Sequence, residues 1–216
     1  MKKILAICLL AVSLYSFKAQ TDYETTTIGS QVWMTQNLNV DKFQNGENIY
    51  FAKNQKAWEK ANGDNKPAYF KVTIVLDGKE YSCNLYNWYA VTDKRGLAPA
   101  GWHIPGIKEY KQLIETLGGE KVAGNKLKSK SGWSENFGTN TSGFNALPVS
   151  YINYSGIYVE PGTSKKNAEG LWWCSEEQYG GGGTLWLKTS NISPYPNVGM
   201  YMSHYTDGLA IRCLKD

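Results

Sequence analysis

Histidine and cysteine are scarce in this sequence, with two and four residues among 216. Cys83, Cys174 and Cys213 lie far apart, and neither His103 nor His204 stands at a metal-ligand spacing from them or from the other histidine. The sequence also lacks phosphate-cradling loops, a serine triad and zinc motifs. We therefore expect no metal and no cofactor, and we assign no catalytic residue from motifs.

Long apolar runs are also rare, and the first one lies at the N-terminus. Residues 4–15 are apolar, follow Lys2 and Lys3, and precede a small residue at Ala19. A run of this length is too short to span a bilayer stably and is typical of a secretory signal. We interpret residues 1–19 as a signal peptide and residues 20–216 as an exported domain without a transmembrane anchor, located in the periplasm, on the cell surface or outside the cell.

The small excess of positive charge lies mostly in that first segment. Lys2, Lys3 and Lys18 leave with it, so the formal net charge falls from +4 to +1. No basic block remains that would attract nucleic acid or a membrane surface, and neither is expected as a partner. The remaining length is ample for one domain with a real core, and no repeat or composition shift marks a second one.

Aromatic residues, in contrast, are abundant, with eight Trp and 15 Tyr. Large aromatic side chains build cores, and they also line sites for sugars and peptides. The candidate ligand contacts are a C-terminal tract and two tryptophans: Tyr195, Tyr201, His204, Tyr205, Trp186 and Trp133. The expected partner is a glycan or a surface protein. The alternative is a structural or adhesion domain whose aromatic residues all lie in the core.

The central pattern of the chain is an amphipathic helix over residues 107–117. Apolar residues recur there at helical spacing, and charged residues fill the opposite face. Pro105 disfavours helix before it, Gly106 is a weak N-cap, and Gly118 suits the left-handed residue that ends a helix. A strand, a turn and a helix are therefore predicted around Trp102.

Other patterns predict a mixed α+β domain. A short helix is expected after Asn54, ending at Gly63, with one more helical turn at residues 122–127. Residues 128–145 are expected to be a long loop pinned by aromatic side chains, and residues 180–183 a flexible glycine run. Turns are expected at Asn45-Gly46 and Asp77-Gly78. Short strands are predicted at 25–28, 32–34, 49–51, 69–76, 81–89, 147–149, 157–159, 171–174, 185–188 and 209–214.

Three residues are the best candidates for chemistry. His103 and Glu109 could form an acid–base pair, or they could fix the corner between strand and helix. Cys174 is followed by acidic residues, which would raise its pKa rather than activate it. An enzyme of unrecognised type stays open only if all three side chains share one cleft.

The chain resembles the Fibrobacter succinogenes major paralogous domain, a family of exported bacterial modules. The resemblance lies in eight blocks in the family's order: WMTQNL at 33–38, LYNWYAV at 85–91, GLAPAGWHIP at 96–105, LGG at 117–119, AGNKLK at 123–128, GFNALP at 143–148, WW at 172–173 and IRC at 211–213. It implies an α+β fold of the C-type-lectin-like class, similar to formylglycine-generating enzymes. It implies no mechanism, and the triplets by which calcium-dependent lectins of this class bind sugar are absent.

The sequence departs from the family at three points. Gly106-Ile107 stands where members usually have Thr-Asp or Ser-Asp, and Cys174-Ser175 stands where serines usually follow the Trp pair. Cys83 lies closer to the LYNWYAV block than the usual cysteine. Because Cys83 and Cys174 are both unusual, we hypothesise a Cys83–Cys174 disulfide with Cys213 a buried thiol, and Cys83–Cys213 remains the alternative.

Overall fold

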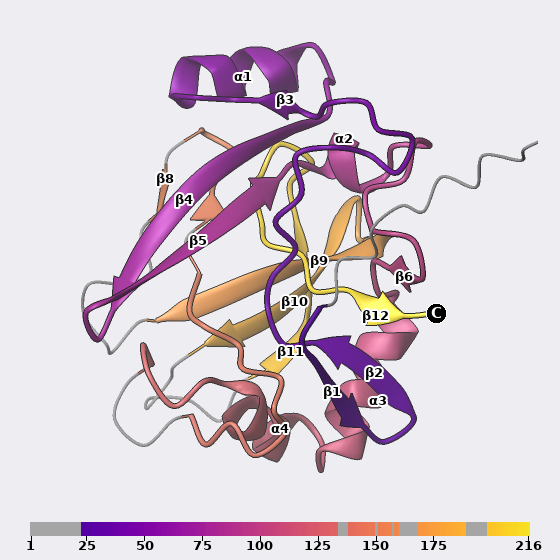
Figure 1. The fold of residues 1–216 in the computed structure, drawn as a ribbon, viewed down its shortest axis with the longest axis vertical. Coiled ribbons are helices and arrows are strands. Elements are labelled where there is room, and N and C mark those ends of the chain that lie inside the picture. Colours follow the sequence, from indigo (N-terminus) through magenta and orange to yellow (C-terminus); the bar gives the residue numbers. More distant parts are fainter. Residues whose placement is uncertain (1–22, 134–137, 150, 157, 160–167, 189–197) are drawn as a thin grey trace, which may run out of the picture.

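Small sheets and short helices alternate along the chain in the computed structural model, which describes residues 23–133, 138–149, 151–156, 158–159, 168–188 and 198–216 (Figure 1). This arrangement confirms the predicted α+β class. The predicted signal peptide lies outside the described residues. Within those ranges, no helix is both long enough and apolar enough to cross a membrane.

The sheet that carries the Trp pair is formed by β9 (Glu169–Gln178), β10 (Gly181–Lys188) and β11 (Val198–Ser203), all antiparallel. Alternation along β9 sends Trp172 into one buried cluster and Trp173 into another, so this sheet is covered on both faces there. Both tryptophans are fully buried. Strand β10 is longer than the strand predicted at 185–188, because the glycine run at 181–183 belongs to it.

The prediction of a flexible glycine run was wrong for residues 181–183, which are buried residues of a strand. A Cβ on Gly182 would lie 2.4 Å from Trp88 Cε3, and a Cβ on Gly183 would lie 2.3 Å from Cys174 Sγ. The glycines are therefore required by close packing, because larger side chains have no space.

A long hairpin forms the second main layer (Figure 1). Its strands β4 (Ala68–Leu76) and β5 (Lys79–Tyr86) pair antiparallel around the predicted Asp77-Gly78 turn, and β3 (Tyr50–Phe51) adds in parallel to β4. The strand predicted to run to residue 89 stops at Tyr86. Asn87 then accepts a hydrogen bond from the Ala90 amide and caps the short helix α2 (Trp88–Val91), so side-chain capping overrides the apolar strand pattern.

The remaining strands are short. They are β1 (Thr25–Ile28), β2 (Gln31–Met34), β6 (Trp102–His103), β7 (Tyr151–Ile152), β8 (Tyr158–Val159) and β12 (Leu214–Lys215), with the order β1-β2-β12-β6 in one sheet and a β7-β8 pair. A strand predicted at 147–149 is absent, and pairing begins at β7 instead.

Residues 208–213 run through the centre of the molecule and connect its layers. Leu209 pairs with Tyr86 on β5, the Ala210 carbonyl accepts from Trp173 on β9, and the Cys213 carbonyl accepts from Met34 on β2. Because successive residues pair with different elements, the strand predicted at 209–214 is regular only at β12. The predicted alternation holds: Leu209, Ile211 and Cys213 belong to one cluster, while Ala210 and Leu214 belong to the other.

Two helices begin and end where capping residues predict, whereas the helical turn predicted at 122–127 begins two residues earlier. Helix α1 (Gln55–Gly63) is capped by the Asn54 side chain, which accepts from the Ala57 amide at 2.9 Å. Helix α3 (Ile107–Thr116) ends where Gly118 adopts a φ of 102°, and α4 (Glu120–Leu127) follows directly. Tyr110, Leu113 and Ile114 of α3 are buried against the β9–β10–β11 sheet, which confirms the predicted amphipathic helix.

We expect Leu113→Ala to lower the free energy of unfolding by roughly 2–5 kcal/mol, as for other large-to-small changes in a core. Leu113 is fully buried in the same cluster as Trp33 and Trp172, so truncation leaves a cavity. Chemical denaturation measures the change. A loss below about 1 kcal/mol would mean that α3 is peripheral to the core.

Candidate functional site

A cavity of about 680 Å³ lies between β5 and the segment that follows β2. Its lining comes from residues 23–24, 35–37, 39–41, 74, 79–83, 145, 147, 149 and 212. The two walls are joined at Val40, whose carbonyl accepts from the Tyr86 hydroxyl at 2.7 Å and from Asn84 Nδ2 at 3.1 Å. These two side chains of β5 thus fix the position of Val40 on the opposite wall.

Arg212 lies at the buried end of this cavity and is only 2% exposed. Its Nε and Nη2 donate to Asn37 Oδ1 at 3.1 and 2.8 Å, and its Nη1 donates to the carbonyls of Met34 and Phe144. The guanidinium also lies 4.6 Å from the centre of the Phe144 ring. Asn37 Oδ1 accepts a third bond, from Trp172 Nε1 at 2.9 Å. One arginine thus connects the segment after β2, the 144 loop and the closing segment.

The mouth of the cavity carries charges of both signs. Glu24, Asp41 and Glu80 are exposed acids, and Lys79 is the base among them. The Lys79 ammonium lies 5.2 Å from the centre of the Tyr81 ring. Side-chain amides and hydroxyls line the cavity together with apolar side chains such as Ile74, Leu147 and Val149, so the cavity offers both hydrogen bonds and apolar contacts.

A second, smaller cleft of about 440 Å³ lies at the start of α3 and contains His103. His103 Nδ1 lies 2.8 Å from Asp216 Oδ1, and His103 Nε2 lies 3.0 Å from Glu109 Oε1. The predicted His103–Glu109 contact is therefore formed. Both ring nitrogens are engaged by carboxylates, an arrangement that favours the imidazolium as a structural clamp and leaves no free nitrogen to act as a base.

Carboxylates also replace the missing side-chain cap of α3. Glu109 Oε2 accepts from the Gly106 amide at 2.7 Å, and Glu176 Oε2, from β9, accepts from the Ile107 amide at 2.8 Å. A Cβ at residue 106 would lie 3.4 Å from the Glu176 carboxyl group, so glycine leaves it room. The weak N-cap predicted at Gly106 is thus compensated by an acid distant in sequence.

The raised pKa of His103 makes the stability of the folded protein depend on pH. Partial burial opposes protonation, but the hydrogen bonds that the ring donates to Asp216 and Glu109 outweigh it and raise the pKa of the imidazole above its usual value. A group with a raised folded-state pKa stabilises fully below its unfolded pKa of about 6.5, and this contribution is lost as pH rises through the folded pKa. His103→Gln should therefore lower the melting temperature more at pH 5.5 than at pH 8.5. Equal losses at the two pH values would contradict the clamp.

The family model of the Fibrobacter succinogenes major domain matches residues 26–215. The chain belongs to this family. No curated protein and no solved structure matches this chain. The matched span contains most of the lining of the Arg212 cavity, although Tyr23 and Glu24 precede it. It also contains His103, whereas Asp216 lies one residue beyond it.

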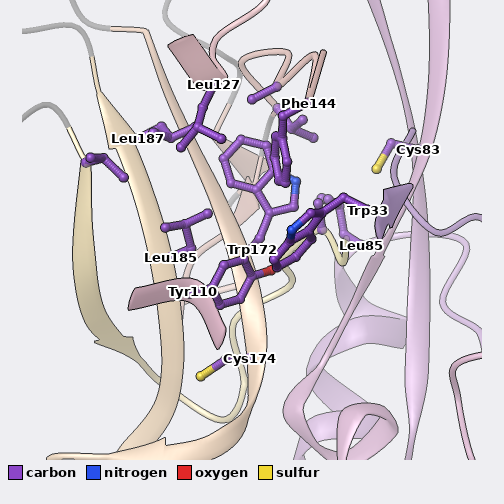
Figure 2. Packing of buried hydrophobic residues seen from close by; sticks show 14 of the residues in the cluster. Trp33, Cys83, Leu85, Tyr110, Leu127, Phe144, Trp172, Cys174, Leu185 and Leu187 are labelled. Carbon is purple, nitrogen blue, oxygen red and sulfur yellow. The ribbon is translucent and has the colours of Figure 1, made fainter. Parts of the chain in front are cut away.

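In this Fibrobacter succinogenes major domain, the predicted Cys83–Cys174 disulfide is not formed: Cys83, Cys174 and Cys213 are all free and buried. Cys83 Sγ accepts from Asn37 Nδ2 at 3.6 Å, whereas Cys174 Sγ donates to the Glu176 carbonyl at 3.4 Å. Figure 2 shows the two sulfurs on opposite sides of the stacked rings of Trp33 and Tyr110. These aromatic rings separate the thiols, and no sequence pattern indicates that they lie there.

The three candidate catalytic residues do not come together. His103 and Glu109 line the second cleft, but the Cys174 side chain packs into the cluster behind β9. Burial raises the pKa of Cys174 to about 11, so the thiolate nucleophile is disfavoured at neutral pH. The enzyme hypothesis required these three side chains to share one cleft, and they do not.

The predicted aromatic contacts divide between core and surface. Trp133 is buried and donates to the Ala146 carbonyl at 2.7 Å, so it pins the 128–145 loop as expected but does not reach solvent. Tyr205 stacks on Trp88 at 6.0 Å between ring centres, and the exposed His204 contacts Tyr154. Tyr195 lies outside the described residues.

Trp186 and Tyr201 form an edge-to-face pair on the outer side of β10 and β11, with ring centres 4.5 Å apart. Tyr201 is 40% exposed. The Lys188 ammonium lies 4.2 Å from the Trp186 ring centre, and Trp186 Nε1 donates to Glu169. The ring of Trp186 is therefore already engaged by its neighbours, which leaves Tyr201 as the open surface of this pair.

No sequence motif indicates a role for Arg212 or Asn37, although both stand in blocks that carry the family resemblance. A lone arginine in an apolar strand, Ile211-Arg212-Cys213, is a signal for a buried cation. Which acceptors surround it could not be inferred, because they come from segments more than 60 residues away.

Proposed function

We propose that this chain is an exported, non-catalytic binding module that holds a glycan in the cavity above Arg212. The cavity itself carries the proposal: its volume of about 680 Å³ lies within the range of about 300–1,000 Å³ usual for small-ligand sites. Sugars need many hydrogen bonds and few charges, and the lining supplies amides, hydroxyls and two half-buried tyrosines, Tyr23 and Tyr81.

The chemistry of the cavity favours binding over catalysis. Its thiol, Cys83, is fully buried, and burial raises its pKa to about 11. Arg212 is held by neutral oxygens and donates hydrogen bonds, so it can hold a ligand but cannot act as a base. In the second cleft, His103 is clamped by two acids.

A C-type-lectin-like fold and an exported location are part of the proposal. Support for the fold comes from the strand β6, which leads into α3 and pairs with β12 directly after Arg212 and Cys213. Support for export comes from the N-terminal sequence. A structural or adhesion domain, or one that binds a surface protein, is the alternative, and the engaged ring of Trp186 and the buried Trp133 favour it for the aromatic tract.

Tryptophan-fluorescence titration and a glycan array with cell-wall and plant polysaccharides test the proposal. Tyr81→Ala, inside the cavity, should weaken binding by about tenfold, which corresponds to about 1.4 kcal/mol. The matched control Tyr201→Ala removes a tyrosine outside the cavity and should leave affinity unchanged.

Three other results are informative. Loss of binding in Tyr201→Ala but not in Tyr81→Ala would move the site to the Trp186–Tyr201 pair. No response to any glycan would remove the glycan proposal. Binding to a cell-surface protein with no glycan response would support the alternative.

A further inference from the structure

Arg212 is a buried cation that has no acidic partner among the residues that the structure describes. Its hydrogen-bond acceptors are the Asn37 side-chain amide and the carbonyls of Met34 and Phe144, all of them neutral. Among the described residues, no carboxylate lies within 4 Å of the guanidinium. Buried charges in proteins are normally paired, because desolvation is costly without a counter-ion. Within the described part of the chain, no acidic side chain therefore compensates the charge of Arg212, which lies at the end of the cavity.

The guanidinium retains both its charge and a donor. Burial lowers the pKa of Arg212 to about 10, which still leaves it protonated at neutral pH. Of its five N–H groups, one goes from Nε to Asn37, one from Nη2 to Asn37, and two from Nη1 to backbone carbonyls. The second N–H of Nη2 has no partner in the described part of the chain.

Asn37 stands where an aspartate would supply the missing charge. Its Oδ1 accepts from Arg212 Nε, Arg212 Nη2 and Trp172 Nε1, and an aspartate of the same shape could accept the same three bonds. Only the long contact from Asn37 Nδ2 to Cys83 Sγ, at 3.6 Å, requires the amide. The local geometry would thus accommodate a counter-ion within the chain, yet a neutral side chain occupies the position.

We propose that the glycan bound in this cavity carries a carboxylate that pairs with Arg212, as a uronic acid residue at a chain end does. This inference rests on the proposed function. The exposed acids Glu24, Asp41 and Glu80 outnumber Lys79 at the mouth and repel a polyanion. The ligand therefore has one acidic unit at the inner end and neutral sugar units at the mouth.

Matched pairs of sugars test the charge requirement on the unmodified protein. The probes are cellobiose with cellobiouronic acid, and glucosyl-xylose with glucuronosyl-xylose, each titrated by calorimetry. The acidic member of a pair should bind at least about tenfold more tightly, and the preference should shrink as salt rises.

The outcomes separate this inference from the proposed function. Equal affinity of acidic and neutral members would overturn the inference and leave glycan binding in place. No binding of either member would count against both. Saturation by sodium acetate alone, with an affinity equal to that of the acidic sugars, would overturn the uronate assignment because the cavity would then recognise only an anion.

Asn37→Asp tests the role of Arg212 directly, with Asn39→Asp as its control. Both variants add one negative charge to the cavity lining, but only Asn37 contacts Arg212. Asn37→Asp should raise the melting temperature and abolish the preference for the acidic sugar, whereas Asn39→Asp should retain most of that preference. If Asn37→Asp lowers the melting temperature or retains the preference, Arg212 does not lack a counter-ion and the inference fails.

Discussion

Arg212→Ala should destabilise the protein by about 4 kcal/mol, through lost hydrogen bonds and a new cavity. The side chain donates four hydrogen bonds to two other segments, residues 34–37 and Phe144, and packs on the Phe144 ring. Its removal leaves buried carbonyl groups of Met34 and Phe144 without these donors. Chemical denaturation followed by tryptophan fluorescence measures the loss.

Two conservative variants separate the contribution of side-chain volume from that of the charge. Arg212→Met fills much of the space and relieves the burial of an unpaired charge, so it should cost less than Arg212→Ala. Arg212→Lys keeps the charge but reaches fewer acceptors, and it should lie between Arg212→Ala and the unmodified protein. An Arg212→Ala loss below about 1 kcal/mol would show that the three segments are held together by packing alone.

The local elements could be predicted because their signals are local. The helix α3 follows from apolar spacing and Gly118, and the β4–β5 hairpin follows from alternation around Asp77-Gly78. Each of these signals lies within the short stretch of sequence that forms the element. The family resemblance added the order of the blocks, and the family match over residues 26–215 agrees with it.

The candidate site could not be predicted because its groups meet through the tertiary fold. Asn37 and Arg212 are 175 residues apart, and Glu176 caps α3 from a distance of 69 residues. The disulfide hypothesis failed for the same reason. Residue spacing cannot show that the rings of Trp33 and Tyr110 lie between Cys83 and Cys174.

The glycine run at 181–183 shows how one composition supports two opposite interpretations. Consecutive glycines suggest a flexible segment when no neighbours are known. In the structure, each of the three lies against a group that a Cβ would strike: Ser203, Trp88 or Cys174. Strand pairing with β9 and β11 fixes the backbone there, so the absence of side chains permits close packing.

Gly182→Ala is accordingly expected to destabilise the protein by about 3 kcal/mol, as overpacking does where rings cannot move. The added Cβ would lie 2.4 Å from Trp88 Cε3 and 2.6 Å from Trp173 Cζ3, and both rings are buried. Trp173 Nε1 is fixed by the Tyr86 carbonyl at 2.7 Å, so this ring cannot turn aside without losing a buried hydrogen bond.

Gly63→Ala is the matched control, because a Cβ at the end of α1 meets nothing within 4 Å. It should be neutral or slightly stabilising, since alanine is the better helix former. Urea denaturation of the two variants side by side gives the comparison. If Gly182→Ala unfolds at the same urea concentration as Gly63→Ala, the rings of Trp88 and Trp173 have room to move, and the glycine run is flexible after all.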